Sequence, residues 1–212
     1  PRGRSEIERA DWGRPQLRRV RGVEVRSRNK VEGLSRVYMA PQGTPMATRE
    51  VTALLLDMAL EDFEKAHRDR VHDTSADLDR QGFIELLSLD VRGKASRRLE
   101  GLEAALETAV KRMLDVEDRF SRGNLRHAKK EVELSLRRRH DEPRGRALAA
   151  VHALLDGEPP SLERKLAELE GVTLGDVQEA VRRLLTTEPF VVRRVRRDGD
   201  FEMKAILEEG EI

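Results

Sequence analysis

The chain has 212 residues, a formal net charge of +1, no cysteine, and equal shares of charged and hydrophobic residues at 38% each. A chain of this length can form one large domain that buries about 70% of the surface its extended form exposes, and its apolar residues at helical spacing exclude disorder. The lack of cysteine excludes a disulfide framework and a thiolate metal site and favours a reducing, cytoplasmic compartment, while no apolar run approaches the roughly 20 residues that cross a bilayer, so no membrane contact is expected.

The N-terminal part is predicted to contain a basic arm, two strands and a helix. Residues 1–20 are polar and rich in arginine without any period, which indicates an extended or partner-bound arm. In 21–28 valines alternate with charged residues, a pattern typical of a half-buried strand. A second strand is predicted at 34–40, ahead of a Pro- and Gly-rich turn. Thr48 is predicted to cap the helix that follows.

The middle of the chain is predicted to hold a loop, a buried strand and a block of helices. Residues 66–81 are polar and crowded with charge, which indicates a frayed helix end and a loop. Residues 82–91 are the most apolar strand candidate and are therefore expected at the centre of the sheet. Pro143 interrupts the helices after this strand because proline cannot continue a helical ladder. Five helices are predicted, with starts or bounds at Ser96, Ser121, 144–155, 161–169 and 173–185.

The C-terminal part is predicted to return to strands. A strand is expected at 189–196, and 201–207 is predicted to pair back on it as a hairpin. Strands before and after a block of consecutive helices favour an α+β fold, with a mixed, mostly antiparallel sheet and helices packed on one face. The expected organisation is therefore a basic arm at 1–20, an α+β domain at 21–197, and a hairpin or tail at 198–212.

A helix is predicted within 171–185, and two polar residues are suited to its start. Thr173 is placed to cap the helix, and Asp176 faces its exposed amides. This stretch resembles the end of a domain in the pitrilysin/insulinase family of zinc peptidases, which includes the mitochondrial processing peptidases. The resemblance covers about 22–195, and four further motifs carry it in the same order: Arg36-Val37-Tyr38-Met39-Ala40-Pro41, strand 82–91 with the helix after Ser96, Leu125-x-x-Ala128-Lys129-Lys130, and 144–149.

The zinc motif of that family is missing. Its members bind zinc through H-x-x-E-H, in which two histidines on one helical face hold the metal and the Glu activates water. The resemblance therefore implies a noncatalytic repeat of the C-terminal type, with no catalytic residue, no metal and no cofactor, and not an enzyme by itself. No pair with the required spacing exists among the histidines, which are His67, His72, His127, His140 and His152.

The resemblance also points to a segment that contacts peptide. In active family members the C-terminal-type domain contributes an Arg and a Tyr to the substrate from an Arg-x6-Tyr segment. The corresponding stretch here is 68–75, which lacks the Tyr and is shorter than the family pattern. Carried over to this stretch, the resemblance implies peptide contacts from Arg68, Arg70 and His72.

Two functions follow as hypotheses. The resemblance implies a noncatalytic domain or subunit that pairs with a zinc-bearing pitrilysin-like partner, or self-associates, and helps to enclose a peptide that adds as a strand to an exposed sheet edge. The alternative is a catalytically dead protein-binding or scaffolding domain whose basic arm docks on an acidic protein surface. Nucleic-acid binding is disfavoured, because aromatic residues are only 3% of the chain and no recognition-helix motif is present.

Overall fold

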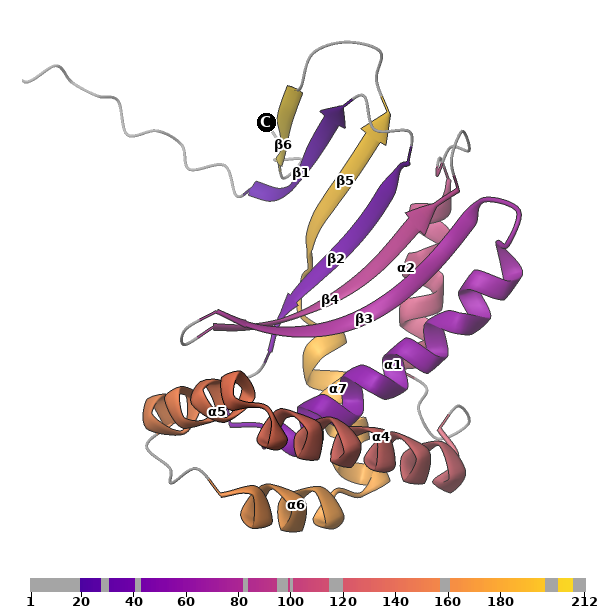
Figure 1. The fold of residues 1–212 in the computed structure, drawn as a ribbon. Coiled ribbons are helices and arrows are strands. Elements are labelled where there is room, and N and C mark those ends of the chain that lie inside the picture. The colour runs from indigo at the N-terminus through magenta and orange to yellow at the C-terminus, as the bar shows by residue number, and fades with distance from the viewer. Residues whose placement is uncertain are drawn as a thin grey trace, which may run out of the picture.

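The computed structural model describes residues 20–27, 31–40, 43–81, 84–94, 99, 101–114, 120–156, 161–196 and 202–207. These residues form one sheet and a set of helices (Figure 1). In chain order the elements are β1 (Val20–Ser27), β2 (Gly33–Met39), α1 (Met46–Ala66), β3 (Val71–Gln81), β4 (Ile84–Gly93), α2 (Leu102–Met113), α4 (Arg122–Asp141), α5 (Pro143–Asp156), α6 (Leu162–Gly171), α7 (Leu174–Leu185), β5 (Phe190–Arg196) and β6 (Glu202–Leu207).

The sheet has six strands in the order β3-β4-β2-β5-β1-β6. Among these described strands, β1 and β5 run parallel and every other neighbouring pair is antiparallel. The predicted α+β class with a mixed, mostly antiparallel sheet is therefore confirmed. The apolar strand β4 is an interior strand, one place in from the β3 edge, and not at the centre of the sheet.

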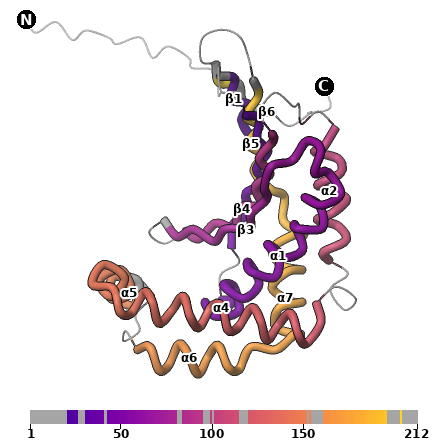
Figure 2. Tube along the Cα trace, turned by 45° about the vertical axis from the view of Figure 1, so that its right-hand side comes forward, coloured from indigo at the N-terminus to yellow at the C-terminus, as the bar shows by residue number. Residues whose placement is uncertain are grey.

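The helices cover one face of the sheet, as predicted. Figure 2 shows the sheet nearly edge-on, with α1, α2 and α7 on the same side and with α4, α5 and α6 as a further layer at one end. Alternation along β4 sends every second side chain to the helices, because successive side chains of a strand point to opposite faces. The core forms where these side chains meet the apolar stripe of α1, and its most buried members include Leu87, Leu89, Val51, Leu55 and Leu60.

Two helix starts are confirmed in atomic detail. Ser121 Oγ accepts a hydrogen bond from the Asn124 amide at 3.1 Å, and the Ser121 amide donates to Asn124 Oδ1 at 3.2 Å, which completes a capping box. Thr173 and Asp176 make the same reciprocal pair at the start of α7, at 3.2 and 2.8 Å. Each pair satisfies amides that have no partner within the helix.

The prediction of a loop across 66–81 is wrong, because residues 71–81 form the edge strand β3. Two features of the sequence conceal it. The pairing with β4 shifts register between Val71 and Asp73, which breaks the period of two. Beyond the shift the helix-facing positions include Thr74 and Ala76, which are too small or too polar to produce a strong apolar alternation.

Two other local predictions are also corrected. Thr48 does not cap α1, because the N-cap is Pro45 and Thr48 lies buried inside the first turn. The C-terminal strand does not fold back on β5 as a hairpin. It pairs antiparallel with β1, with Met203 opposite Val25. Strand β1 therefore lies between β6 and β5, and it runs parallel to β5.

Several predictions concern residues outside the described ranges. Residues 1–19 of the expected basic arm and Ser96, the expected start of α2, lie there. The described part of α2 begins at Leu102 after Gly101, whose φ of 78° suits glycine. The domain boundaries at 20 and 197 stay predictions. No helix in the described ranges combines the length and the apolar character needed to cross a membrane.

Candidate peptide-contacting site

Two arginines on the helix-covered face of the sheet are held in ion pairs with α2. Arg36 of β2 reaches Glu107 of α2 at 3.3 Å, and Arg193 of β5 reaches Glu103 of the same helix at 2.6 Å. Both pairs tie α2 to the sheet. Since Arg36 is 8% exposed, its pair with Glu107 serves the packing of the sheet against α2.

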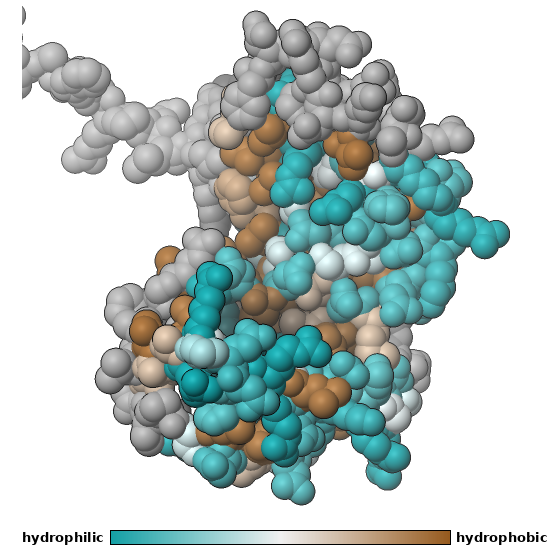
Figure 3. All heavy atoms as spheres, in the orientation of Figure 1, coloured by the Kyte–Doolittle hydropathy of each residue, from teal (hydrophilic) through white to brown (hydrophobic). Residues whose placement is uncertain are grey.

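The opposite face of the sheet has no helix over it within the described residues. Alternation and strand register place a run of apolar side chains there, from β4 through β2 and β5 to β1 and β6. In Figure 3 brown side chains gather over β1 and β5, and teal side chains over β3 and β4. We call this surface the open face. Its apolar members are Ile84, Leu86, Val37, Met39, Phe190, Val192, Val23, Val25 and Met203.

Polar side chains on the β3 side of the open face bond to one another. Ser35 donates a hydrogen bond to Asp90 across β2 and β4, and Ser75 donates to Asp77 Oδ2 at 2.7 Å on β3. The open face thus runs from an acidic, hydrogen-bonded border to an apolar half. Such an uncovered apolar face is typical of a surface that meets a peptide or another domain.

The edge strand β3 is partly closed by a side chain of α1. Asp57 Oδ1 accepts a hydrogen bond from the backbone amide of Ala76 at 2.9 Å. Because this amide already donates to Asp57, it is occupied and not free to donate to an added strand. Burial is the main cause that raises the pKa of Asp57 above 3.8, and the neighbouring Asp77 adds to it, while the Ala76 amide acts in the opposite direction.

The structure places the three predicted peptide-contacting residues at one end of this edge. Arg68 and Arg70 lie in the turn between α1 and β3, and His72 lies at the register shift of β3. Lys94 holds the turn, because its side chain donates to the Arg68 carbonyl and its amide donates to the Arg70 carbonyl at 2.7 Å. The side chains of Arg68 and His72 are exposed. Their contact with peptide stays a prediction.

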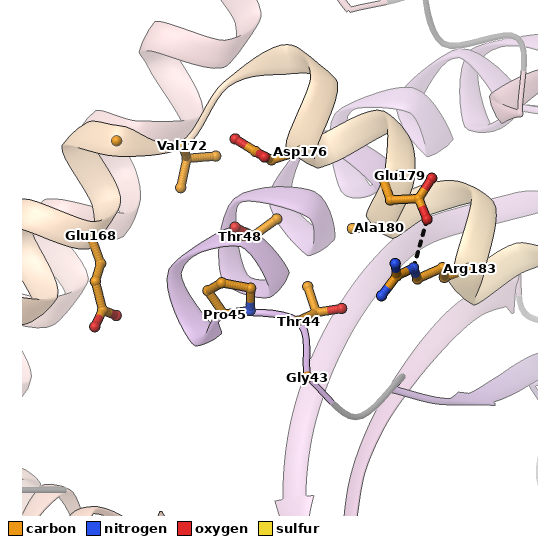
Figure 4. Close-up of a pocket in the computed structure, with 11 residues that line it drawn as sticks. Gly43, Thr44, Pro45, Thr48, Glu168, Val172, Asp176, Glu179, Ala180 and Arg183 are labelled. Atoms are coloured by element: carbon orange, nitrogen blue, oxygen red, sulfur yellow. Dashed lines mark hydrogen bonds and ion pairs between the residues drawn. The ribbon is translucent and has the colours of Figure 1, made fainter.

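A hollow of about 270 Å³ lies where the start of α1 meets α6 and α7 (Figure 4). The charged groups that line it are already engaged. Glu179 pairs with Arg183 at 2.6 Å, and Asp176 belongs to the capping box of α7. We therefore interpret this hollow as a helix junction without a role in binding.

The chemistry of the described residues does not include a metal centre. Within those ranges no group of three or more His, Asp or Glu side chains is arranged to hold a metal ion. His67 packs against Phe63, with ring centroids 4.6 Å apart, and its neighbour His72 is exposed on the strand that follows. The surfaces considered as the candidate site are the open face and the β3 edge.

No protein-family model and no curated protein matches this sequence. Solved structures match over most of its length. A protease from Helicobacter pylori has a TM-score of 0.63 at 9% identity, over 82% of this chain and 43% of its own. The peptidase M16 inactive domain from Pseudomonas fluorescens has a TM-score of 0.61 at 12% identity, over 82% of this chain and 42% of its own.

A third match spans nearly the whole of its chain. The inactive peptidase domain of a putative zinc protease from Bordetella parapertussis has a TM-score of 0.64 at 15% identity, over 85% of this chain and 96% of its own. The chain described here spans less than half the length of the Helicobacter and Pseudomonas proteins. The resemblance predicted from the sequence is therefore confirmed for the fold, which this chain shares with pitrilysin-like peptidase M16 domains, inactive ones included.

Proposed function

We propose that this chain is a noncatalytic pitrilysin-like domain that pairs with a zinc-bearing peptidase domain or subunit and helps to enclose a peptide. The observation that carries the proposal is the shared fold with M16 domains described as inactive. No pair among the five histidines has the H-x-x-E-H spacing. In this role the chain forms part of the chamber around the peptide, and the zinc-bearing partner hydrolyses the peptide.

The open face and the β3 edge are the surfaces best suited to that role. The apolar half of the open face offers area for burial against a peptide or partner, at roughly 25 cal/mol for each Å² removed from water. The β3 edge offers backbone groups to an extended peptide. Because Asp57 already bonds to the Ala76 amide, a peptide strand pairs on either side of Ala76 or displaces that carboxylate. Arg68 and His72 then lie where one end of the peptide passes.

Reconstitution tests the proposal. The purified chain is measured for zinc by mass spectrometry and for hydrolysis of quenched fluorescent peptides, alone and after mixing with an H-x-x-E-H-bearing pitrilysin-like protein from the same organism. We expect no zinc and no hydrolysis for the chain alone, a complex by light scattering, and faster hydrolysis by the complex than by the partner. Stoichiometric zinc with hydrolysis by the chain alone contradicts the proposal. A chain that stays monomeric beside such a partner favours the scaffolding alternative.

A further inference from the structure

A second surface lies at the helical end of the molecule, where α4, α5 and α6 enclose a groove of about 600 Å³. That volume is within the range of ligand-binding sites. Figures 1 and 2 show these three helices as a layer apart from the upper part of the sheet. The apolar walls come from four helices, through Met46 of α1, Leu136 of α4, Leu148 of α5 and Leu162 of α6.

The α5 helix carries apolar residues outward beside this groove. Leu148 is 49% exposed and Val151 is 51% exposed, and their spacing of three residues puts them on neighbouring parts of one helical face. The main contact of α5 within the described residues is with α4. An exposed apolar strip that continues into an apolar groove is typical of a docking site for another element.

The rim of the groove is basic. Arg139 pairs with Glu50 at 2.8 Å, and Arg146 donates to the carbonyls of His140 and Asp141, so these two arginines hold the corner of α4 and α5. Two further cations, Arg144 and Lys165, line the groove and make no ion pair with any residue that the structure describes. Among the residues that the structure describes, Glu142 is the one acidic side chain that lines it. The charge of the rim therefore complements an acidic occupant.

The residues that line the groove also favour one backbone conformation of the occupant. The described residues that line the groove come from helices and their ends, and none of them belongs to a strand. An extended peptide would bury its backbone amides and carbonyls here without partners, which costs free energy for each group. A helix satisfies these groups internally and presents apolar side chains at i, i+3, i+4 and i+7 to such a groove.

We propose that the α4–α5–α6 groove, with the adjoining Leu148 and Val151, binds an acidic amphipathic helix of a partner protein. Apolar side chains of that helix enter between Leu136, Leu148 and Leu162, and its carboxylates face Arg144 and Lys165. This interface is independent of the proposed peptidase pairing, because it uses neither the open face nor the β3 edge.

The test uses a synthetic, fluorescein-labelled helix of roughly 18 residues, long enough to form a helix in isolation, with leucines on one face and glutamates elsewhere. Fluorescence anisotropy measures its binding to the full chain. Leu148→Glu is expected to weaken binding about tenfold, which is a loss of about 1.4 kcal/mol. Leu134→Glu is the matched control, since Leu134 is 48% exposed on α4 and does not line the groove. Its binding should equal that of the unmodified chain.

The charge of the rim is tested separately. The double variant Arg144→Glu with Lys165→Glu should bind the acidic helix more weakly, and it should bind a helix with lysines in place of glutamates more tightly. If Leu148→Glu does not fold, this double variant still tests the proposal. Equal binding of a peptide with scrambled leucines, or equal loss in Leu134→Glu, overturns the proposal. So does binding of dodecanoate without binding of the helix, which assigns the groove to a small amphiphile. A dimer that Leu148→Glu dissociates, without peptide binding, assigns it to a second copy of the chain.

Discussion

The carboxylate of Asp57 on α1 lies 2.9 Å from the backbone nitrogen of Ala76, in the middle of the edge strand β3. One hydrogen bond thus joins the longest helix of the core to the strand that ends the sheet. Proteins commonly protect such edges, because unpaired backbone groups invite a strand from another chain. Asp57 protects the β3 edge in this way at Ala76. The residues next to Asp57 in the sequence do not predict this contact.

Replacement of Asp57 by Ala is expected to lower the free energy of unfolding by about 1–3 kcal/mol, because the Ala76 amide loses its acceptor in a buried position. Urea unfolding measures the change. Asp62→Ala is the control on the same helix, since its side chain is 71% exposed, and a change within about 0.5 kcal/mol is expected there. Light scattering should show more association in Asp57→Ala than in the control. Equal stability of the two variants contradicts this account of Asp57.

The pH dependence of the Asp57 contribution has a definite sign. Burial raises its pKa above 3.8 in the folded chain, so the folded state holds more protons than the unfolded state just above that pH. The part of the contribution that comes from the raised pKa adds to the Ala76 hydrogen bond; it is complete below about pH 3.8 and is lost as the pH rises through the folded pKa. The stability of the native chain minus that of Asp57→Asn should fall as pH rises across this window, measured by urea unfolding at each pH. A difference that rises with pH contradicts the prediction.

The corner between α4 and α5 depends on Gly145. A Cβ at this position would lie 2.0 Å from the carbonyl oxygen of Arg139, so Gly145→Ala forces the two helices apart. A loss of about 1–3 kcal/mol is expected, as for other overpacked sites. Gly171 at the end of α6 has open space around its Cβ position, and Gly171→Ala should be neutral or slightly stabilising. Thermal unfolding of both variants compares them directly, and a Gly145→Ala chain as stable as Gly171→Ala would show that the corner adjusts freely.

The sequence predicted those parts of the fold whose signal is local. The caps at Ser121 and Thr173 and the helix break at Pro143 each depend on a few neighbouring residues, and all three are confirmed. The strand β3 was missed because its register shift and its small core residue Ala76 weaken the alternation. The partner of β6 was missed because β1 lies at the other end of the chain.

The sequence predicts the candidate surfaces less well than it predicts the fold. The prediction at Arg68, Arg70 and His72 came from a resemblance, and the structure places these residues at the end of an edge strand that the sequence did not reveal. The groove beside Leu148 is lined by residues of four helices that lie apart in the sequence. One available signal was the pair Leu148 and Val151, which are apolar although the helix packs through its other side.

Arg68 and His72 provide the test of the peptide contact itself. In the reconstituted complex, Arg68→Ala and His72→Ala should each raise KM for a peptide with acidic residues by about two- to fivefold and leave kcat unchanged, because an exposed ion pair or hydrogen bond contributes up to about 1 kcal/mol to binding. Arg126→Ala on α4 is the control, since its side chain is exposed and it is not part of the turn between α1 and β3. Arg70 is only partly exposed. Because Arg70→Ala can therefore lower the stability of the fold, its KM is compared together with its unfolding curve. If Arg126→Ala raises KM as much as the other two, the effect comes from overall charge, and the turn between α1 and β3 is not a peptide contact.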